Sequence, residues 1–200
     1  MIDLTPQPLR REQMASVNDL RKHVLDDAVE LMETLGMVDP LARRSDLPTP
    51  ALRFLRRVLA KYATLVFTRL HTKAGRGPTG ITASIDGVLE AAKQSPSFNP
   101  AEIVTFQDRR EKLLDEMPAY GVSLEQLNLF RNAELAHSLH PHQPIQPFAM
   151  HVLHTFGDKT YELVRDVESA LIKCGAPDIQ TLPTDKYDEW FAHAQALWQL

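Results

Sequence analysis

Apolar side chains recur at intervals of three and four residues along most of this chain, the spacing that gives an α-helix one apolar side. Prolines and glycines cluster between these stretches, at residues 40–50, 75–80, 96–100, 118–121, 141–147 and 175–183. No stretch shows the sustained alternation of apolar and polar residues that marks a half-buried strand. The pattern therefore predicts an all-α protein, a single-domain helical bundle of about six to seven helices.

The positions of these prolines and glycines also predict where the helices lie. We expect them over Leu9–Leu35, from Pro50 past Arg69, over Ile81–Ala92 and Pro100–Met117, from Ser123 onward, and over Phe148–Cys174 and Lys186–Leu200. The second helix is expected to turn one set of side chains to a shared face, namely Leu55, Val58, Tyr62, Leu65 and Arg69.

Local signals set three of the helix ends. Gly36 is expected to cap the first helix at its C-terminus. Thr49 is expected to be the N-cap of the second helix, with Pro50 at its first position. Ser123 and Gln126 have the spacing of a capping box at the start of the fifth helix.

Size and charge limit the classes of protein that fit. The chain has 200 residues and is 44% hydrophobic, enough for one core, so we expect one domain over 1–200 in which about the first eight residues form a flexible tail. A net charge of -4 excludes a uniformly basic nucleic-acid binder. The one cysteine, Cys174, excludes a disulfide framework, and we expect it to be structural. No signal peptide or membrane span is visible, so we expect a cytoplasmic protein without membrane contact.

Arg131 occupies an unusual place on the fifth helix. At about 100° per residue it falls between Leu124, Leu127 and Leu135, while Asn132 is turned away from that sector. An unpaired guanidinium is costly on such a face, so it needs a carboxylate, a subunit interface or a ligand phosphate. A simpler interpretation stays open, in which the arginine reaches solvent along its methylene stem and His137 caps the last helical turn.

The stretch "RNAELAH" resembles the signature of the HEPN superfamily, the helical domains of prokaryotic toxin and abortive-infection systems. That signature has an arginine, a polar residue beside it and, a few positions later, a histidine, matched here by Arg131, Asn132 and His137. The segment "FTRLHTKAGRGPTGITASIDGVLE" is similar to the abortive-infection subgroup. Some members carry a tyrosine two residues after the histidine, which a partner nucleotidyltransferase modifies; Leu139 stands there, so this regulation is not expected.

The resemblance implies a metal-independent endoribonuclease that acts as a toxin or phage-defence effector, without a cofactor. It implies that Arg131, Asn132 and His137 are the catalytic residues and that RNA is the substrate. It also implies a homodimer with the motif at the interface, and a cognate antitoxin protein as a partner. The residue types fit, because a histidine titrates near neutral pH and an arginine binds phosphate oxygens with a permanent charge.

Two alternatives remain open. One is a non-catalytic HEPN-like bundle that binds a partner protein or nucleic acid. The other is a metal-dependent helical enzyme that uses the histidine cluster, namely His137, His140, His142, His151 and His154.

Two stretches of the chain are rich in charged residues. Arg53, Arg57 and Lys61 recur at every fourth position, so they form one stripe that either follows a phosphate backbone or is simply solvated. The mixed-charge run Asp108–Lys112 is expected to lie on the surface.

Overall fold

The computed structural model describes residues 11–44, 47, 49–77, 80–81, 83–93, 98–136, 148–179, 182–183 and 185–198. The described chain forms seven α-helices, which are α1 (Arg11–Ala42), α2 (Pro50–Leu70), α3 (Ile85–Ala92), α4 (Pro100–Glu116), α5 (Leu124–Ala136), α6 (Phe148–Lys173) and α7 (Lys186–Trp198). A 3-10 turn follows α4 at Met117–Tyr120, and Arg76–Gly77 (β1) pairs antiparallel with Gly80–Ile81 (β2). The predicted all-α bundle of six to seven helices is confirmed.

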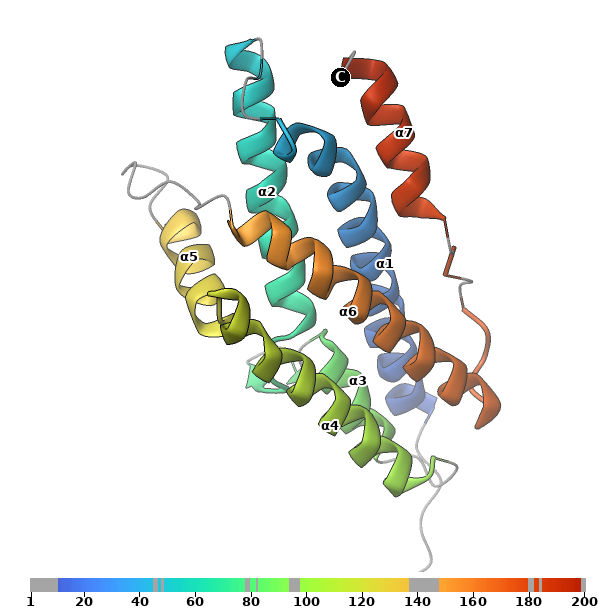
Figure 1. Ribbon diagram of the computed structural model, residues 1–200. Coiled ribbons are helices and arrows are strands. Elements are labelled where there is room, and N and C mark those ends of the chain that lie inside the picture. The colour runs from blue at the N-terminus through green and yellow to red at the C-terminus, as the bar shows by residue number, and fades with distance from the viewer. Residues whose placement is uncertain are drawn as a thin grey trace, which may run out of the picture.

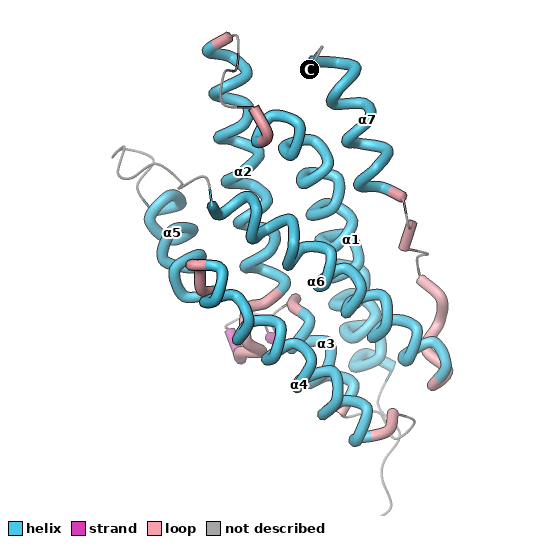
Figure 2. The backbone as a smooth tube through the Cα atoms, viewed as in Figure 1, coloured by secondary structure: helices cyan, strands magenta, loops and turns pink. Residues whose placement is uncertain are grey.

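The helices pack around α1 (Figure 1, Figure 2). α1 contacts α2, α6, α7 and α3, while α4 packs on α6 and α5 lies at the edge of the bundle against α2. The core-facing side of α6 is formed by Leu153, Phe156, Leu163, Val167 and Leu171, which are all buried. No helix in the described part of the chain is long and apolar enough to cross a lipid bilayer.

A buried ion pair fastens α1 to α6. Arg21 is 1% exposed and donates from Nε to Glu168 Oε2 at 3.1 Å and from Nη2 to Glu168 Oε1 at 2.5 Å. The same guanidinium donates to Asn18 Oδ1 at 2.9 Å and to the Pro177 carbonyl oxygen at 2.9 Å. It therefore joins α1, α6 and the segment after α6 at one point, with its charge fully partnered.

The prediction that Gly36 ends the first helix is wrong. α1 continues through Gly36 and Pro40 to Ala42. A Cβ atom at Gly36 would lie 2.6 Å from the backbone oxygen of Tyr187, because α7 crosses α1 there. Gly36 is needed for this close approach of two helices and does not act as a cap.

The start of α2 is confirmed, and the face shared by Leu55, Val58, Tyr62, Leu65 and Arg69 is not the side that is buried. Thr49 Oγ1 accepts a hydrogen bond from Leu52 N at 3.2 Å, and Pro50 is the first helical residue. Val58 is 41% exposed and Tyr62 38% exposed. The buried side is made instead by Ala60, Ala63, Thr64, Val66, Phe67, Thr68 and Leu70. α2 carries apolar residues on two sides, and its small residues allow the neighbouring helices to approach on only one of them.

The third helix begins later than predicted, and the fourth begins as predicted. Ser84 Oγ accepts a hydrogen bond from Gly87 N at 3.1 Å, so this serine caps α3, while Ile81 belongs to β2. Asn99 Oδ1 caps α4 through Ala101 N at 3.0 Å. Cys174 directly follows α6 and is partly buried against the core.

Candidate functional site

α5, the helix that carries the arginine of the motif, is anchored at its first turn. Ser123 Oγ accepts a hydrogen bond from Gln126 N at 3.2 Å, and Gln126 Oε1 accepts one from Ser123 N at 2.9 Å. This reciprocal pair is the predicted capping box. Leu127 in the next turn is only 4% exposed, so it holds α5 against the bundle.

Arg131 lies one helical turn beyond Leu127 on the same side of α5, and its side chain is half-buried. Asn132 follows it in the helix, and Ala136 is the last residue of α5. His137 comes directly after Ala136 but lies outside the described residues, as do His140 and His142. The structure thus places Arg131 and the backbone of Asn132 on α5, and it does not place His137 relative to them.

A second arginine and histidine meet inside the bundle. Arg110 is 3% exposed and His71 0% exposed, and the guanidinium of Arg110 donates to the His71 carbonyl oxygen. The prediction that the run Asp108–Lys112 lies wholly on the surface is therefore wrong at Arg110. The signal was present in the sequence, because Arg110 follows Ile103 and Phe106 on the buried face of α4.

Hydrogen bonding fixes the tautomer of the neutral His71 ring. Thr160 Oγ1 donates to the Phe156 carbonyl oxygen at 2.7 Å, so it accepts from His71 Nε2 at 2.8 Å. Burial, and then the charge of Arg110, lower the pKa of His71 to about 3. His71 is therefore a neutral interior side chain that joins α2 to α6, and neither it nor Arg110 is accessible to a substrate.

A charged cluster joins α1 and α2 near the surface. Arg69 Nε donates to Asp27 Oδ2 at 2.5 Å, and Arg69 Nη2 lies 3.3 Å from Glu30 Oε2. The Tyr62 hydroxyl donates to the Glu30 carboxylate. Burial raises the pKa of Asp27 even though Arg69 opposes the shift. Each charge has a partner of opposite sign, so the cluster serves to hold the two helices together.

A surface pocket of about 290 Å³ is lined by residues of α1, α6 and α7 and the segment before α7. Asp158, Glu162 and Asp188 line it together with Arg165 and Lys186. Burial raises the pKa of Asp158. Charges of both signs offset one another in this pocket, so it has no positive field that would draw in an RNA phosphate.

One described histidine, His154, packs against a residue that lines this pocket. The His154 ring packs edge-on against Tyr187 with centroids 4.9 Å apart, and the Tyr187 hydroxyl donates to Asp39 Oδ2 at 2.5 Å. The side chain of His151 lies outside the described part. Among the described residues, no group of three or more histidines, cysteines or carboxylates could hold a metal ion.

Comparison with known proteins finds no matching family model, no matching curated protein and no matching solved structure.

Proposed function

We propose that this protein is a metal-independent endoribonuclease of the HEPN type, which acts in the cytoplasm as a toxin or phage-defence effector. Its site is formed by Arg131, Asn132 and His137. The proposal is supported by the half-buried position of Arg131 on a capped helix that ends one residue before His137. The other arginine–histidine pair described above, Arg110 with His71, is closed to substrate.

The three side chains have the chemistry that this reaction needs. The 2′-oxygen of the RNA attacks the adjacent phosphorus, the bond to the 5′-oxygen breaks, and a 2′,3′-cyclic phosphate forms. His137 accepts the 2′-hydroxyl proton or supplies a proton to the leaving 5′-oxygen. Arg131 stabilises the charge that develops on the phosphate oxygens, and Asn132 orients the histidine or the phosphate.

The proposal includes a homodimer, because one histidine cannot be base and acid in the same step. A second copy would bring a second Arg131 and His137 to the same cleft. Leu129 lies two residues before Arg131 and is 62% exposed, which offers an apolar contact next to the motif. A cognate antitoxin protein is a further partner in this proposal.

Alanine variants of the two charged residues test the proposal. Arg131→Ala and His137→Ala should each reduce RNA cleavage by about two to four orders of magnitude, because each removes a group that acts in the transition state. Both variants should keep a melting temperature close to that of the unaltered protein, because residues kept for chemistry rarely supply stability. Cleavage time courses and thermal melting measure the two effects.

Arg109→Ala is the matched control, because Arg109 forms an exposed ion pair with Asp166 at 2.9 Å. It should retain nearly full cleavage. Variants at 131 and 137 that melt far below the control would show a structural role, and the proposed site would be rejected.

One observation favours a second candidate function, binding of a partner by a non-catalytic bundle. The outer side of α2 exposes apolar and basic residues together, among them Phe54 at 64% exposure. This surface can serve a partner whether or not the protein cleaves RNA.

A further inference from the structure

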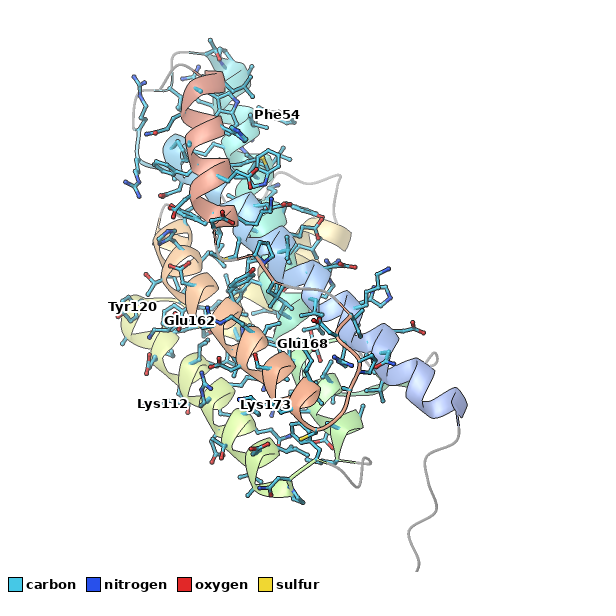
Figure 3. All side chains as sticks on the ribbon, turned by 90° about the vertical axis from the view of Figure 1, so that its right-hand side faces the viewer. Phe54, Lys112, Tyr120, Glu162, Glu168 and Lys173 are labelled. Carbon is cyan, nitrogen blue, oxygen red and sulfur yellow. The ribbon has the colours of Figure 1, made fainter. Side chains whose placement is uncertain are left out.

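The first half of α2 contributes almost nothing to the core. None of residues 50–59 is buried, whereas seven residues between Ala60 and Leu70 are. Ala51, Phe54, Leu55, Val58 and Tyr62 follow the helical spacing of one apolar stripe. Phe54 is 64%, Val58 41% and Tyr62 38% exposed, so large apolar side chains of this stripe face solvent. Figure 3 shows Phe54 projecting from the upper part of α2, on the side away from α6.

A basic stripe runs beside the apolar one. Arg53 and Arg57 are exposed and Lys61 is half-buried, and the three follow one another at every fourth position. Arg56 lies on another side of the helix and donates to the Arg44 carbonyl oxygen at 3.0 Å. α2 contains no aspartate or glutamate. The exposed apolar stripe is therefore bordered by positive charge alone along its own helix.

We infer that Phe54, Val58 and Tyr62, with the flanking Arg53 and Arg57, form a docking face for an acidic amphipathic helix of a partner protein. The partner helix would lay its apolar side chains against the stripe and set carboxylates opposite the two arginines. Helices recognise apolar grooves and faces through residues at this spacing. The complementary charges would speed association and select against basic segments.

A second copy of the chain fits this face poorly. If two α2 helices packed against each other, Arg53, Arg57 and Lys61 of one copy would lie opposite the same residues of the other copy. Like charges at such a contact oppose association. The homodimer proposed above uses the α5 side and does not need this face.

RNA also fits this face less well than a helix does. Successive turns of the stripe are about 6 Å apart, nearly twice the spacing of stacked bases, and the residue between the two rings is the aliphatic Val58. The Tyr62 hydroxyl donates to the Glu30 carboxylate, so its one hydrogen is not available to bond a phosphate oxygen or a base. Alternating Phe, Val and Tyr at helical spacing suits interdigitation with another helix.

Binding of a synthetic peptide tests this inference on the full chain. The probe is a labelled helical peptide with leucines along one side and glutamates on both borders, and its partner control has lysines in place of the glutamates. Fluorescence anisotropy should show that the acidic peptide binds and the basic one does not. Phe54→Ala and the double variant Arg53→Glu/Arg57→Glu should each weaken binding about tenfold or more. The charge variant should also reduce the dependence of binding on salt.

Two substitutions on α4 are matched controls. Val104 is an apolar residue 52% exposed, and Lys112 is an exposed cation, which Figure 3 shows far from Phe54. Val104→Ala and Lys112→Glu should leave peptide binding unchanged, and all variants should melt near the unaltered protein.

Three results would overturn the inference. The first is no binding of the acidic peptide, or binding that is indifferent to Phe54. The second is binding of a single-stranded oligouridine that Phe54→Ala abolishes while the peptide fails to bind. The third is self-association, measured by sedimentation, that Phe54→Ala abolishes. None of the three depends on whether the protein cleaves RNA, so this test and that of the proposed nuclease fail separately.

Discussion

Removing Glu168 should strongly destabilise the fold, because it leaves the buried Arg21 guanidinium without a counter-charge. Arg21 is 1% exposed and makes two hydrogen bonds to this carboxylate. Breaking one partner of a buried pair costs about 3–5 kcal/mol. Asn18 Oδ1 and the Pro177 carbonyl oxygen still accept from Arg21, so we expect Glu168→Ala to fall near the lower end, at about 3 kcal/mol.

The double variant Arg21→Met/Glu168→Leu distinguishes the cost of leaving the Arg21 charge uncompensated from the cost of losing the ion pair itself. It replaces both charged side chains by apolar ones of similar size, so no uncompensated charge remains. We expect it to be more stable than Glu168→Ala by at least about 1 kcal/mol, since apolar replacements of buried pairs are often neutral. The coupling between the two positions is obtained from a double-mutant cycle.

Urea unfolding followed by circular dichroism measures these free energies. The exposed pair of Arg109 with Asp166, at 2.9 Å, is the matched control, and Arg109→Ala should cost no more than about 1 kcal/mol. If Glu168→Ala cost as little as Arg109→Ala, the conclusion that this ion pair is buried and fastens α1 to α6 would be wrong.

The remaining stability predictions concern α1 and the interior. Gly36→Ala should lower the free energy of unfolding by about 1–3 kcal/mol, because its Cβ would lie 2.6 Å from the Tyr187 backbone oxygen and push α7 away; a change within error would contradict that contact. The pKa of His71 is lowered from 6.5 to about 3 in the folded protein. Between pH 6.5 and pH 3 the unfolded chain therefore binds a proton at this histidine that the folded chain does not bind. This contribution to stability is complete above pH 6.5 and is lost as pH falls toward 3, by up to about 1.4 kcal/mol per pH unit. As the pH is lowered, the urea concentration at the unfolding midpoint should fall less for His71→Gln than for the unaltered protein. The same dependence of the midpoint on pH in both proteins would refute a buried neutral His71.

Much of the helical framework could be predicted from the sequence, because long periodic segments and local caps depend on neighbouring residues. The cap at Thr49 and the reciprocal pair of Ser123 and Gln126 are such local features. The end of α1 could not be predicted this way. Gly36 has the residue type of a cap, and only the crossing of α7 explains why the helix continues.

The side of a helix that becomes buried was harder to predict than the helix itself. α2 has apolar residues on two sides, so periodicity alone did not decide whether Val58 or Phe67 would be buried. Arg110 was misplaced because the charge of its neighbours outweighed its position on the α4 stripe. The contact of His71 with Thr160 joins residues far apart in sequence, and no local signal predicts it. For the motif, the sequence predicts a site at Arg131, Asn132 and His137, and the structure describes the side chain of Arg131 alone.

The most direct test of the proposed function is cleavage of RNA by the purified protein in excess EDTA. The proposed reaction uses only protein side chains, so the rate should be the same with and without the chelator, and the products should carry 2′,3′-cyclic phosphate ends. His137→Ala, assayed in parallel, should cleave at least about a hundredfold more slowly. Cleavage that EDTA abolishes and zinc or manganese restores, or no difference between His137→Ala and the unaltered protein, would contradict a metal-independent ribonuclease centred on Arg131 and His137.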